Sequence, residues 1–334
     1  MPDTLAPKSS LNGATKDELV FMYTQMRLIR RVEELAAKAY TQRKILGFCH
    51  LYIGQESVAV GAAASTMDDY WITAYREHGH AIAKGVPAND VMAELFGKAT
   101  GSVHGLGGSM HIFDKSKQFM GGWGIVGGHV PLANGVGWAI NHRGEDKVCV
   151  CYFGDGAMHQ GAFFEALCLA QLYKLPCVFI CENNFYAMGT SLDRQSAITD
   201  MCRRADGVGM INEQFEGFDV EVVRDRVAAA REHARSGKGP VLLEIITYRY
   251  RGHSMSDPAK YRAEGELEEK KLYDPLKITA ARLMNDFGMS QEDIDALNAN
   301  ADKEAQASYD FAEASPLPDV NNLYDYVYAD QEGV

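Results

Sequence analysis

The sequence predicts an α/β fold, in which a doubly wound, mostly parallel sheet carries helices on both faces. Two short apolar runs, residues 148–153 and 177–181, flank a stretch with helical periodicity. A strand, a helix and a strand of this size form a right-handed βαβ unit, whose two strands are parallel. The 334 residues, 46% of them apolar and 23% charged, match the composition of an ordinary globular enzyme with a sizeable core.

The chain is expected to hold one domain, preceded by a flexible N-terminal segment over residues 1–15. Residues 16–330 would form this α/β domain, with a helical C-terminal portion. Its first element is a long helix predicted over residues 16–40, where the core-facing positions recur at helical intervals: Leu19, Met22, Met26 and Ile29. The glycine-rich stretch 101–108 predicts a loop instead of a packed element.

The elements that follow alternate as a parallel sheet requires. Between the two apolar runs, one helical face carries Phe163, Ala166, Leu167 and Ala170. A further helix is predicted near residues 222–235, and a further strand over residues 241–247. Beyond residue 262 the chain is charged and helical and contains no evident catalytic signature.

Charge and hydropathy argue against two classes of function. A net charge of −12 disfavours nucleic-acid binding, which draws much of its affinity from neutralised phosphates. No apolar run approaches the roughly 20 residues that a membrane helix needs. The first 18 residues are polar and contain acids, which is untypical of a signal peptide or an Arg-rich transit peptide. We therefore expect a bacterial cytoplasmic location or, if a transit peptide has been removed, the mitochondrial matrix.

Seven cysteines occur without a CxxC pair, and most stand in apolar strand or helix patterns. Small buried hydrophobic side chains in a reducing compartment explain them better than metal ligands or disulfides do. Three histidines lie in or beside glycine-rich segments without a spacing typical of a metal site: His104, His111 and His129.

The carboxyl ends of the two βαβ strands predict a metal and diphosphate site. Asp155 follows the first strand, and Asn184 follows the second, 29 positions later. Both strands deliver their last residues to the same sheet edge, where open α/β sheets bind ligands. A carboxylate oxygen, an amide oxygen and a backbone carbonyl suit magnesium, which completes its shell with phosphates and water.

Two glycines, Gly154 and Gly156, flank Asp155. We expect them to permit a tight turn and a close approach of phosphate to backbone amides. The following helix would point its N-terminus, with a favourable dipole, at the same place. A lone GDG is often a simple turn. The complete order of strand, GDG, helix, strand and NN is more specific, and the sequence contains neither a GxGxxG after a strand nor a GxxxxGK[ST] motif.

GDG, 26 intervening residues and NN form a pattern that resembles the signature of thiamine-diphosphate enzymes. The wider sequence resembles the α subunits of the pyruvate dehydrogenase (acetyl-transferring) component of 2-oxo acid dehydrogenase complexes. The matching segments are spread over residues 48–262: FCHLYIGQE (48–56), ITAYREHGH (72–80), GGSMHIF (107–113), GWGIVGG (122–128), KLPCVFICENN (174–184) and TYRYRGHSMSDPAKYR (247–262). The resemblance implies the thiamine-diphosphate-binding fold, with thiamine diphosphate and Mg²⁺ as cofactors.

The resemblance assigns site residues position by position. The metal ligands would be Asp155, Asn184 and the backbone oxygen of Tyr186. Arg76 and Arg249 would hold the diphosphate, because a guanidinium fork suits phosphate geometry. The other cofactor contacts that it implies are Tyr75, Gly124, Val126, Gly156, Ala157 and His253.

His50 and His253 match the family's active-site histidines. The resemblance implies that they orient substrate and stabilise charge or pass protons, although a lone histidine is more often structural. Met188 matches a side chain that supports the bent cofactor, with a core methionine as the alternative. Residues 250–261 resemble a loop that orders over the active site. The positions that match serines phosphorylated in mitochondrial relatives are Ser254 and Ser191.

The implied function is oxidative decarboxylation of pyruvate, with transfer of the acetyl group to lipoyl groups on a dihydrolipoyl acetyltransferase core. In this family a β subunit supplies the glutamate that activates the aminopyrimidine, so we expect a chain that works within an α₂β₂ heterotetramer. Branched-chain 2-oxo acids and acetoin remain alternative substrates. A non-catalytic, diphosphate-binding regulatory subunit is an alternative of another class, which would not need His50 and His253.

Overall fold

The structure, a computed structural model, describes residues 13–325 and 327, so most of the predicted N-terminal segment lies outside the described residues. Its centre is a six-stranded parallel sheet in the order β2-β1-β3-β4-β8-β7. The strands are β1 (Tyr70–Ala74), β2 (Phe119–Trp123), β3 (Cys149–Gly154), β4 (Cys177–Asn183), β7 (Ile211–Glu216) and β8 (Val241–Ile246). A separate antiparallel hairpin consists of β5 (Tyr186–Ala187) and β6 (Thr190–Ser191). The predicted parallel sheet is confirmed.

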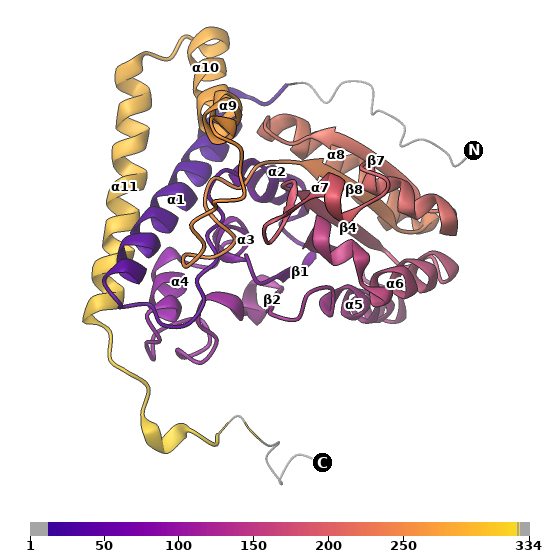
Figure 1. The fold of residues 1–334 in the computed structure, drawn as a ribbon, viewed down its shortest axis with the longest axis horizontal. Helices are drawn as coiled ribbons and strands as arrows, with labels where there is room; N and C mark the ends of the chain where they lie inside the picture. Colours follow the sequence, from indigo (N-terminus) through magenta and orange to yellow (C-terminus); the bar gives the residue numbers. More distant parts are fainter. Residues whose placement is uncertain (1–12, 326, 328–334) are drawn as a thin grey trace.

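Helices cover both faces of this sheet (Figure 1). They are α1 (Lys16–Thr41), α2 (Glu56–Thr66), α3 (His78–Ala83), α4 (Ala88–Leu95), α5 (His129–Arg143), α6 (Gly161–Leu172), α7 (Leu192–Gln195), α8 (Val220–His233), α9 (Glu266–Lys270), α10 (Pro275–Phe287) and α11 (Gln291–Ala314). One apolar core lies under α1, α2, α3 and α8, and a second lies under α5 and α6. The doubly wound arrangement is therefore confirmed. Within the described part of the chain, no helix is both long and apolar enough to cross a membrane.

Successive residues of the strands face these two cores in turn. In β3, Val150 and Tyr152 pack on the α1 side, whereas Cys149, Cys151 and Phe153 pack beneath α5 and α6. All five side chains are at most 1% exposed. A parallel strand buried on both faces reads as a continuous apolar run, which is why this strand was legible in the sequence.

Helix α1 begins where the sequence supplies a cap. The Thr15 side chain accepts a hydrogen bond from the Glu18 amide, and the Glu18 carboxylate accepts one from the Thr15 amide. The four predicted core-facing side chains are all buried: Leu19, Met22, Met26 and Ile29. Helices α10 and α11 pack against α1, and Figure 1 shows α11 running alongside it. The C-terminal part of the described chain is thus helical in α9, α10 and α11.

The βαβ unit differs from the prediction at the start of its helix. Asp155–His159 form a short 3₁₀ segment, and α6 begins only at Gly161. Between them Gln160 is extended, with φ −75° and ψ 137°, and this interrupts the helical run. The helix predicted after the GDG turn is therefore divided into this 3₁₀ segment and α6.

The cysteines are buried, as predicted, with one exception. Cys168 is exposed on α6, whereas the others are packed in the cores. Burial raises the pKa of the Cys149 and Cys151 thiols, which therefore stay neutral and behave as small apolar side chains.

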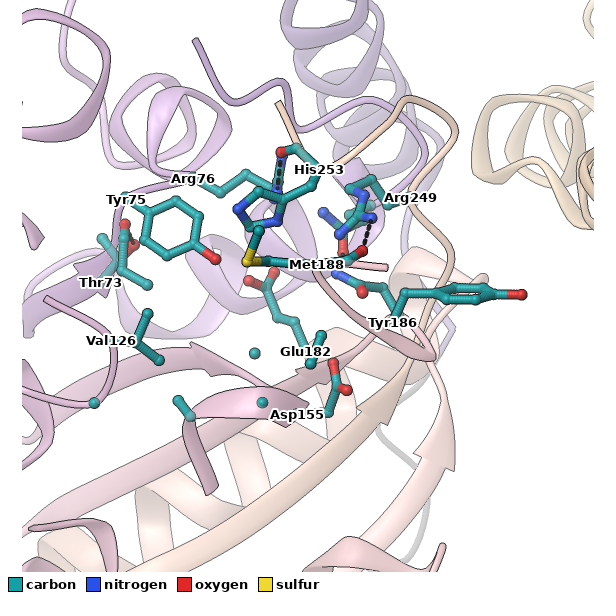
Figure 2. Close-up of a pocket in the computed structure, with 18 of the residues that line it drawn as sticks. Thr73, Tyr75, Arg76, Val126, Asp155, Glu182, Tyr186, Met188, Arg249 and His253 are labelled. Atoms are coloured by element: carbon teal, nitrogen blue, oxygen red, sulfur yellow. Dashed lines mark hydrogen bonds between the residues drawn. The ribbon is translucent and has the colours of Figure 1, made fainter. Parts of the chain in front are cut away.

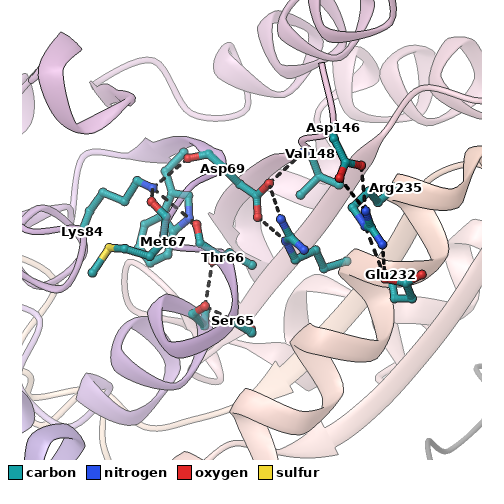
Figure 3. A network of polar contacts seen from close by, with 12 residues as sticks. Ser65, Thr66, Met67, Asp69, Lys84, Asp146, Val148, Glu232 and Arg235 are labelled. Atoms are coloured by element: carbon teal, nitrogen blue, oxygen red, sulfur yellow. Dashed lines mark hydrogen bonds and ion pairs between the residues drawn. The ribbon is translucent and has the colours of Figure 1, made fainter. Parts of the chain in front are cut away.

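A buried lysine fixes the approach to β1 (Figure 3). Lys84 is 1% exposed, and its ammonium group donates to the carbonyls of Thr66, Met67 and Asp69, where α2 ends. The Asp69 carboxylate in turn accepts a 2.9 Å hydrogen bond from the amide of Val148, just before β3. These bonds hold the starts of β1 and β3 together, and the opposite ends of these two strands carry the candidate site.

Candidate active site

A cavity of about 260 Å³ opens at the carboxyl ends of β1, β3 and β4. Asp155 and Asn184, which the sequence predicts to be neighbours, both line it. Tyr75 and Arg76 enter from the segment after β1, and Arg249 enters from the segment after β8. Figure 2 shows Tyr75, Arg76, Asp155 and Arg249 around one space, although they come from the ends of three different strands, β1, β3 and β8.

Asp155 is a buried carboxylate without a full counter-charge. Asp155 is 1% exposed, and this burial raises the pKa of its carboxyl group. A hydrogen bond from Nε2 of Gln195 to Oδ2 opposes that shift, as does the charge of Arg249. A bound divalent cation would supply the missing positive charge.

Asn184 presents a buried acceptor that has no partner. Its Nδ2 donates to Oε1 of Gln55 at 3.1 Å, whereas its Oδ1 has no hydrogen bond among the described residues. The preceding Asn183 holds the turn: its Nδ2 donates to Glu244 at 2.6 Å, and its Oδ1 accepts from the amide of Phe185 at 3.1 Å. An orphaned buried amide oxygen costs free energy, which a cation would recover.

The turn that follows has an uncommon backbone. Phe185 and Met188 adopt φ values of 68° and 54°, in the left-handed region that is costly for residues with a Cβ. Between them, the Tyr186 ring points away from the cavity (Figure 2), and its hydroxyl donates to Glu266 at 2.8 Å. Because Tyr186 still lines the cavity, it contributes to the site through its main chain. Met188 is 65% exposed, which excludes the alternative of a core methionine.

Two buried guanidinium groups line the cavity, and neither forms an ion pair with a described carboxylate. Arg76 is 8% exposed and donates to the carbonyls of Leu51 and His253, each at 2.7 Å. Arg249 is 2% exposed and donates to the Tyr261 hydroxyl at 3.0 Å. Burial, together with the charge of Arg249, lowers the pKa of Arg76 to about 10. Two like charges held this way favour an anion between them.

The backbone conformation requires a glycine at neither position 154 nor position 156 on the ground of a positive φ. Neither Gly154 nor Gly156 has a positive φ, and the extended backbone of Gly154 (φ −85°, ψ 165°) is open to any residue. A Cβ at Gly156 would instead lie 2.8 Å from the Cβ of Ala187. The glycine at 156 is thus required by packing against the β5–β6 hairpin, a contact that the local sequence does not reveal.

His50 and His253 stand together beside a second cavity, of about 650 Å³. Their ring centroids are 5.2 Å apart, and the Tyr75 ring lies 4.6 Å from the first and 5.7 Å from the second. Burial, reinforced by the charge of Arg76, lowers the pKa of His50 to about 2 and that of His253 to about 4. Both imidazoles are therefore neutral near pH 7, and each ring can donate one hydrogen bond and accept another.

The two cavities adjoin, because Tyr75, Val126, Met188 and His253 line both. Every site residue predicted from the sequence lines at least one of them: His50, Tyr75, Arg76, Gly124, Val126, Asp155, Gly156, Ala157, Asn184, Tyr186, Arg249 and His253. The structure thus gathers residues from distant parts of the chain at one sheet edge.

The loop of residues 250–261 forms one wall of the second cavity. Asp257 organises it by accepting hydrogen bonds from the amides of His253, at 2.6 Å, and Ala259, at 2.8 Å. Ser254, one of the two matched serines, is 8% exposed and bonds with a neighbouring serine hydroxyl inside the loop. A phosphate on Ser254 would therefore disrupt the loop that holds His253.

Among the polar residues that line the cavity or bond to Asp155 and Asn184, three that the sequence analysis did not predict are Gln55, Glu182 and Gln195. Gln55 and Gln195 bond to Asn184 and Asp155 across long sequence distances, and no local pattern indicates that. Glu182 is 7% exposed, lines the cavity and accepts a hydrogen bond from the Tyr52 hydroxyl. Its signal was present, since a charged residue in an otherwise apolar buried strand is rarely there for packing.

The cavity fits a metal-bound diphosphate. Oxygen ligands of the type that magnesium prefers stand at Asp155 and Asn184, one of them orphaned and the other buried with a raised pKa. The two guanidinium groups supply the fork geometry and the charge that phosphate oxygens need. Each of these buried polar groups would gain a partner from such a ligand.

Comparison with known proteins identifies relatives over almost the whole chain. The family model named "Dehydrogenase E1 component" matches residues 24–321. "Pyruvate dehydrogenase E1 component subunit alpha" of Rhizobium meliloti (strain 1021) is 47% identical over 312 residues, which cover 93% of this chain and 90% of the relative. The protein of the same name from Zymomonas mobilis is 45% identical over 323 residues, covering 96% and 91%. The somatic mitochondrial form from Homo sapiens is 42% identical over 318 residues, covering 94% and 80%.

Proposed function

The chain belongs to the dehydrogenase E1 component family, and from that premise we propose that it is the α subunit of a pyruvate dehydrogenase. It catalyses oxidative decarboxylation of pyruvate and passes the acetyl group to lipoyl groups of a dihydrolipoyl acetyltransferase core. One observation carries the proposal. Two adjoining cavities, which share four lining residues, are bordered by a metal-type donor pair, two guanidinium groups without a described carboxylate partner and a neutral histidine pair.

Thiamine diphosphate and Mg²⁺ are the proposed cofactors. Asp155, Oδ1 of Asn184 and the backbone oxygen of Tyr186 hold the metal, and Arg76 and Arg249 hold the diphosphate oxygens. The remaining contacts are proposed at Tyr75, Gly124, Val126, Gly156, Ala157 and His253. When bound, thiamine diphosphate supplies the nucleophilic ring carbon and the electron sink that decarboxylation of a 2-oxo acid needs.

His50 and His253 act on the substrate in this proposal. As neutral imidazoles they donate hydrogen bonds to the substrate oxygens and hold or pass protons at their ring nitrogens. Both Nδ1 atoms are buried and without a partner among the described residues, so each is available to a ligand. The loop of residues 250–261 closes this space and excludes water.

We further propose that the chain works in an α₂β₂ heterotetramer, with the cofactor held between the two kinds of subunit. The words "subunit alpha" in the names of these relatives support the presence of a second kind of subunit. In this arrangement the β subunit contributes the glutamate that activates the aminopyrimidine. The proposed location of the assembly is the bacterial cytoplasm, in keeping with two bacterial relatives of high coverage.

Pyruvate is favoured over branched-chain 2-oxo acids and acetoin, because relatives with 42–47% identity carry its name. A purely regulatory, diphosphate-binding subunit is disfavoured by the histidine pair. Diphosphate binding alone has no need of two adjacent neutral imidazoles, 5.2 Å apart, beyond the metal and arginine groups.

The test is substrate-dependent reduction of an artificial electron acceptor by the chain co-purified with its β partner, with thiamine diphosphate and Mg²⁺. Pyruvate is compared with branched-chain 2-oxo acids and acetoin, and fast reduction with pyruvate alone is expected. Asp155→Ala should abolish Mg²⁺-dependent cofactor binding, whereas Asp310→Ala, an exposed acid on α11, should not. His253→Ala should lower turnover about 100-fold or more with little change in cofactor affinity. Tight cofactor binding without any turnover would support the regulatory alternative.

A further inference from the structure

A chain of buried polar groups ends at the backbone of His50. The His50 amide donates to Oγ of Ser109 at 3.2 Å. Nε2 of His78 lies 2.9 Å from that same Oγ and 3.0 Å from the Ser109 carbonyl oxygen. Nδ1 of His78 lies 2.9 Å from Oε2 of Glu33. Glu33 comes from α1, His78 from α3 and Ser109 from the 3₁₀ turn Gly108–Met110, so three separate elements converge on His50.

The carboxylate at the far end of this chain also reaches the same segment directly. Oε1 of Glu33 accepts a 2.7 Å hydrogen bond from the amide of Tyr52. The carbonyl between these two amides, that of Leu51, accepts a 2.7 Å hydrogen bond from Arg76. Three consecutive residues, 50–52, therefore have their backbone groups anchored by side chains from other elements.

The middle of the chain is an ion pair. The side chains of His78 and Glu33 are both 0% exposed. Burial by itself opposes a charge on His78, but the charge and hydrogen bond of Glu33 outweigh it and raise the pKa of His78. Its two ring nitrogens bridge Glu33 and Ser109, and this bridge holds the Ser109 side chain in place.

The His50 ring itself has no such anchor. Its Nδ1 is buried without a hydrogen-bond partner among the described residues, and its ring packs against the rings of Phe48, Tyr75 and His253. The direction in which the imidazole points therefore depends on the position of its own backbone. A shift of that backbone would move the ring away from the space that it shares with His253.

A nucleophilic role for Ser109 is excluded by its burial. Ser109 is 4% exposed and its hydroxyl is already engaged by His50 and His78, so a substrate has no access to it. A purely structural role would need only a bridge between α1 and α3. The Glu33–His78 pair by itself supplies that bridge. The hydrogen bond from the His50 amide to Ser109 is then left without a reason.

We propose that Glu33, His78 and Ser109 form a positioning relay that fixes the backbone of His50 and thereby orients its imidazole toward the substrate. The inference rests on the proposed function only in giving His50 a substrate to act on. Ser109 is a positioning residue, and its hydroxyl is the last link of the relay.

The first variant is Ser109→Ala, assayed in the complex with the β partner. It removes the acceptor of the His50 amide and leaves Asp155, Asn184 and both arginines in place. A misplacement on the order of 1 Å in a catalytic group can cost about 100-fold in rate, so we expect turnover to fall roughly 10- to 100-fold. The dissociation constant for thiamine diphosphate should stay within twofold of the wild type. Ser308→Ala, which removes another fully buried hydroxyl, on α11, is the matched control and should change neither value.

A double-mutant comparison tests whether Ser109 acts through His50. In a His50→Ala background, adding Ser109→Ala should cost less than about twofold more, because the ring to be oriented is absent. A full additional loss would show that the serine supports something else and would overturn the relay. Unchanged turnover of the single variant would also overturn it.

Hydrogen exchange of the assembled complex supplies a readout that does not depend on activity. Ser109→Ala should speed exchange in the peptide that contains residues 49–53, whereas a peptide from α11 should exchange as in the wild type. Unchanged exchange at residues 49–53 would overturn the anchoring. A wild-type complex inactive with every 2-oxo acid would instead overturn the proposed function, and the exchange comparison would then decide the anchoring alone.

Discussion

Gln195→Ala tests the assignment of Asp155 without removing any proposed ligand. Nε2 of Gln195 donates to Oδ2 of Asp155, whose residue is 1% exposed. Burial raises the pKa of this carboxyl group, and the hydrogen bond from Gln195 is the largest influence that lowers it. The variant therefore weakens the support of the carboxylate while leaving the carboxylate in place.

The expected magnitude follows from the loss of one hydrogen bond to a charged, buried group. Such a bond contributes about 1.5–3 kcal/mol. That free energy corresponds to a roughly 10- to 150-fold weaker affinity for the metal-bound cofactor. Outer partners of metal ligands typically contribute about 10- to 100-fold, which agrees with this range.

The pH dependence has a definite sign. The carboxylate binds metal only when ionised, and the variant raises the pKa of Asp155 further above its ordinary value. Ionisation is then lost earlier as the pH falls, so the defect should be larger at pH 6 than at pH 8.

The assay is a titration of the α/β complex with thiamine diphosphate at fixed Mg²⁺, at pH 6, 7 and 8, followed by quenching of intrinsic fluorescence. Gln171→Ala is the matched control, because Gln171 lies near the end of α6, donates to the carbonyl of Gly209 at 2.8 Å and lines neither cavity. A dissociation constant within twofold of the wild type at every pH would refute the reasoning. Tighter binding would also refute it, by showing that Gln195 competes with the metal.

Three further changes separate stability from cofactor binding. Asp155→Asn removes a buried charge with a raised pKa, so it should raise the melting temperature of the cofactor-free chain while abolishing Mg²⁺-dependent binding. The folded-state pKa of His253, about 4, lies below its ordinary value, so its contribution to stability is present above about pH 6.5 and is lost as the pH falls toward 4. His253→Gln should therefore flatten the acid side of a stability–pH curve measured by urea unfolding. Lys84→Met removes the donor of three carbonyls, of which that of Thr66 still accepts from the Asp69 amide. At a cost of about 2 kcal/mol or more, it should lower the melting temperature by roughly 4–8 °C with unchanged cofactor affinity, unlike the exposed control Lys303→Met.

The sequence was most informative where local pattern and burial coincide. Residues 148–153 and 177–181 were recognisable because strands buried on both faces must be apolar throughout, and the structure places them side by side as β3 and β4. The four core positions of α1 followed from helical spacing alone. Asp155 and Asn184 could be predicted as neighbours because parallel strands end at one edge, and both line the same cavity.

The side chains that hold the site residues in place could not be predicted from such patterns. Gln195 reaches Asp155 from 40 positions away, and Glu33 reaches the backbone of Tyr52 from α1. Neither contact leaves a periodic or motif-like trace, because the chain path between the partners decides it. The division of the predicted helix into a 3₁₀ segment and α6 has the same origin, since one extended residue, Gln160, interrupts a stretch whose composition is helical.

By itself, the sequence determined the parallel α/β architecture, the sheet edge that holds the candidate site and the residue types at that edge. These features depend on side-chain periodicity and strand direction, which are local properties of the chain. The tertiary structure alone decided the charge states and the positions of the side chains, since both depend on burial and on partners distant in sequence. Burial beside Arg76 makes His50 neutral, and the anchoring of its backbone by Ser109 fixes its place.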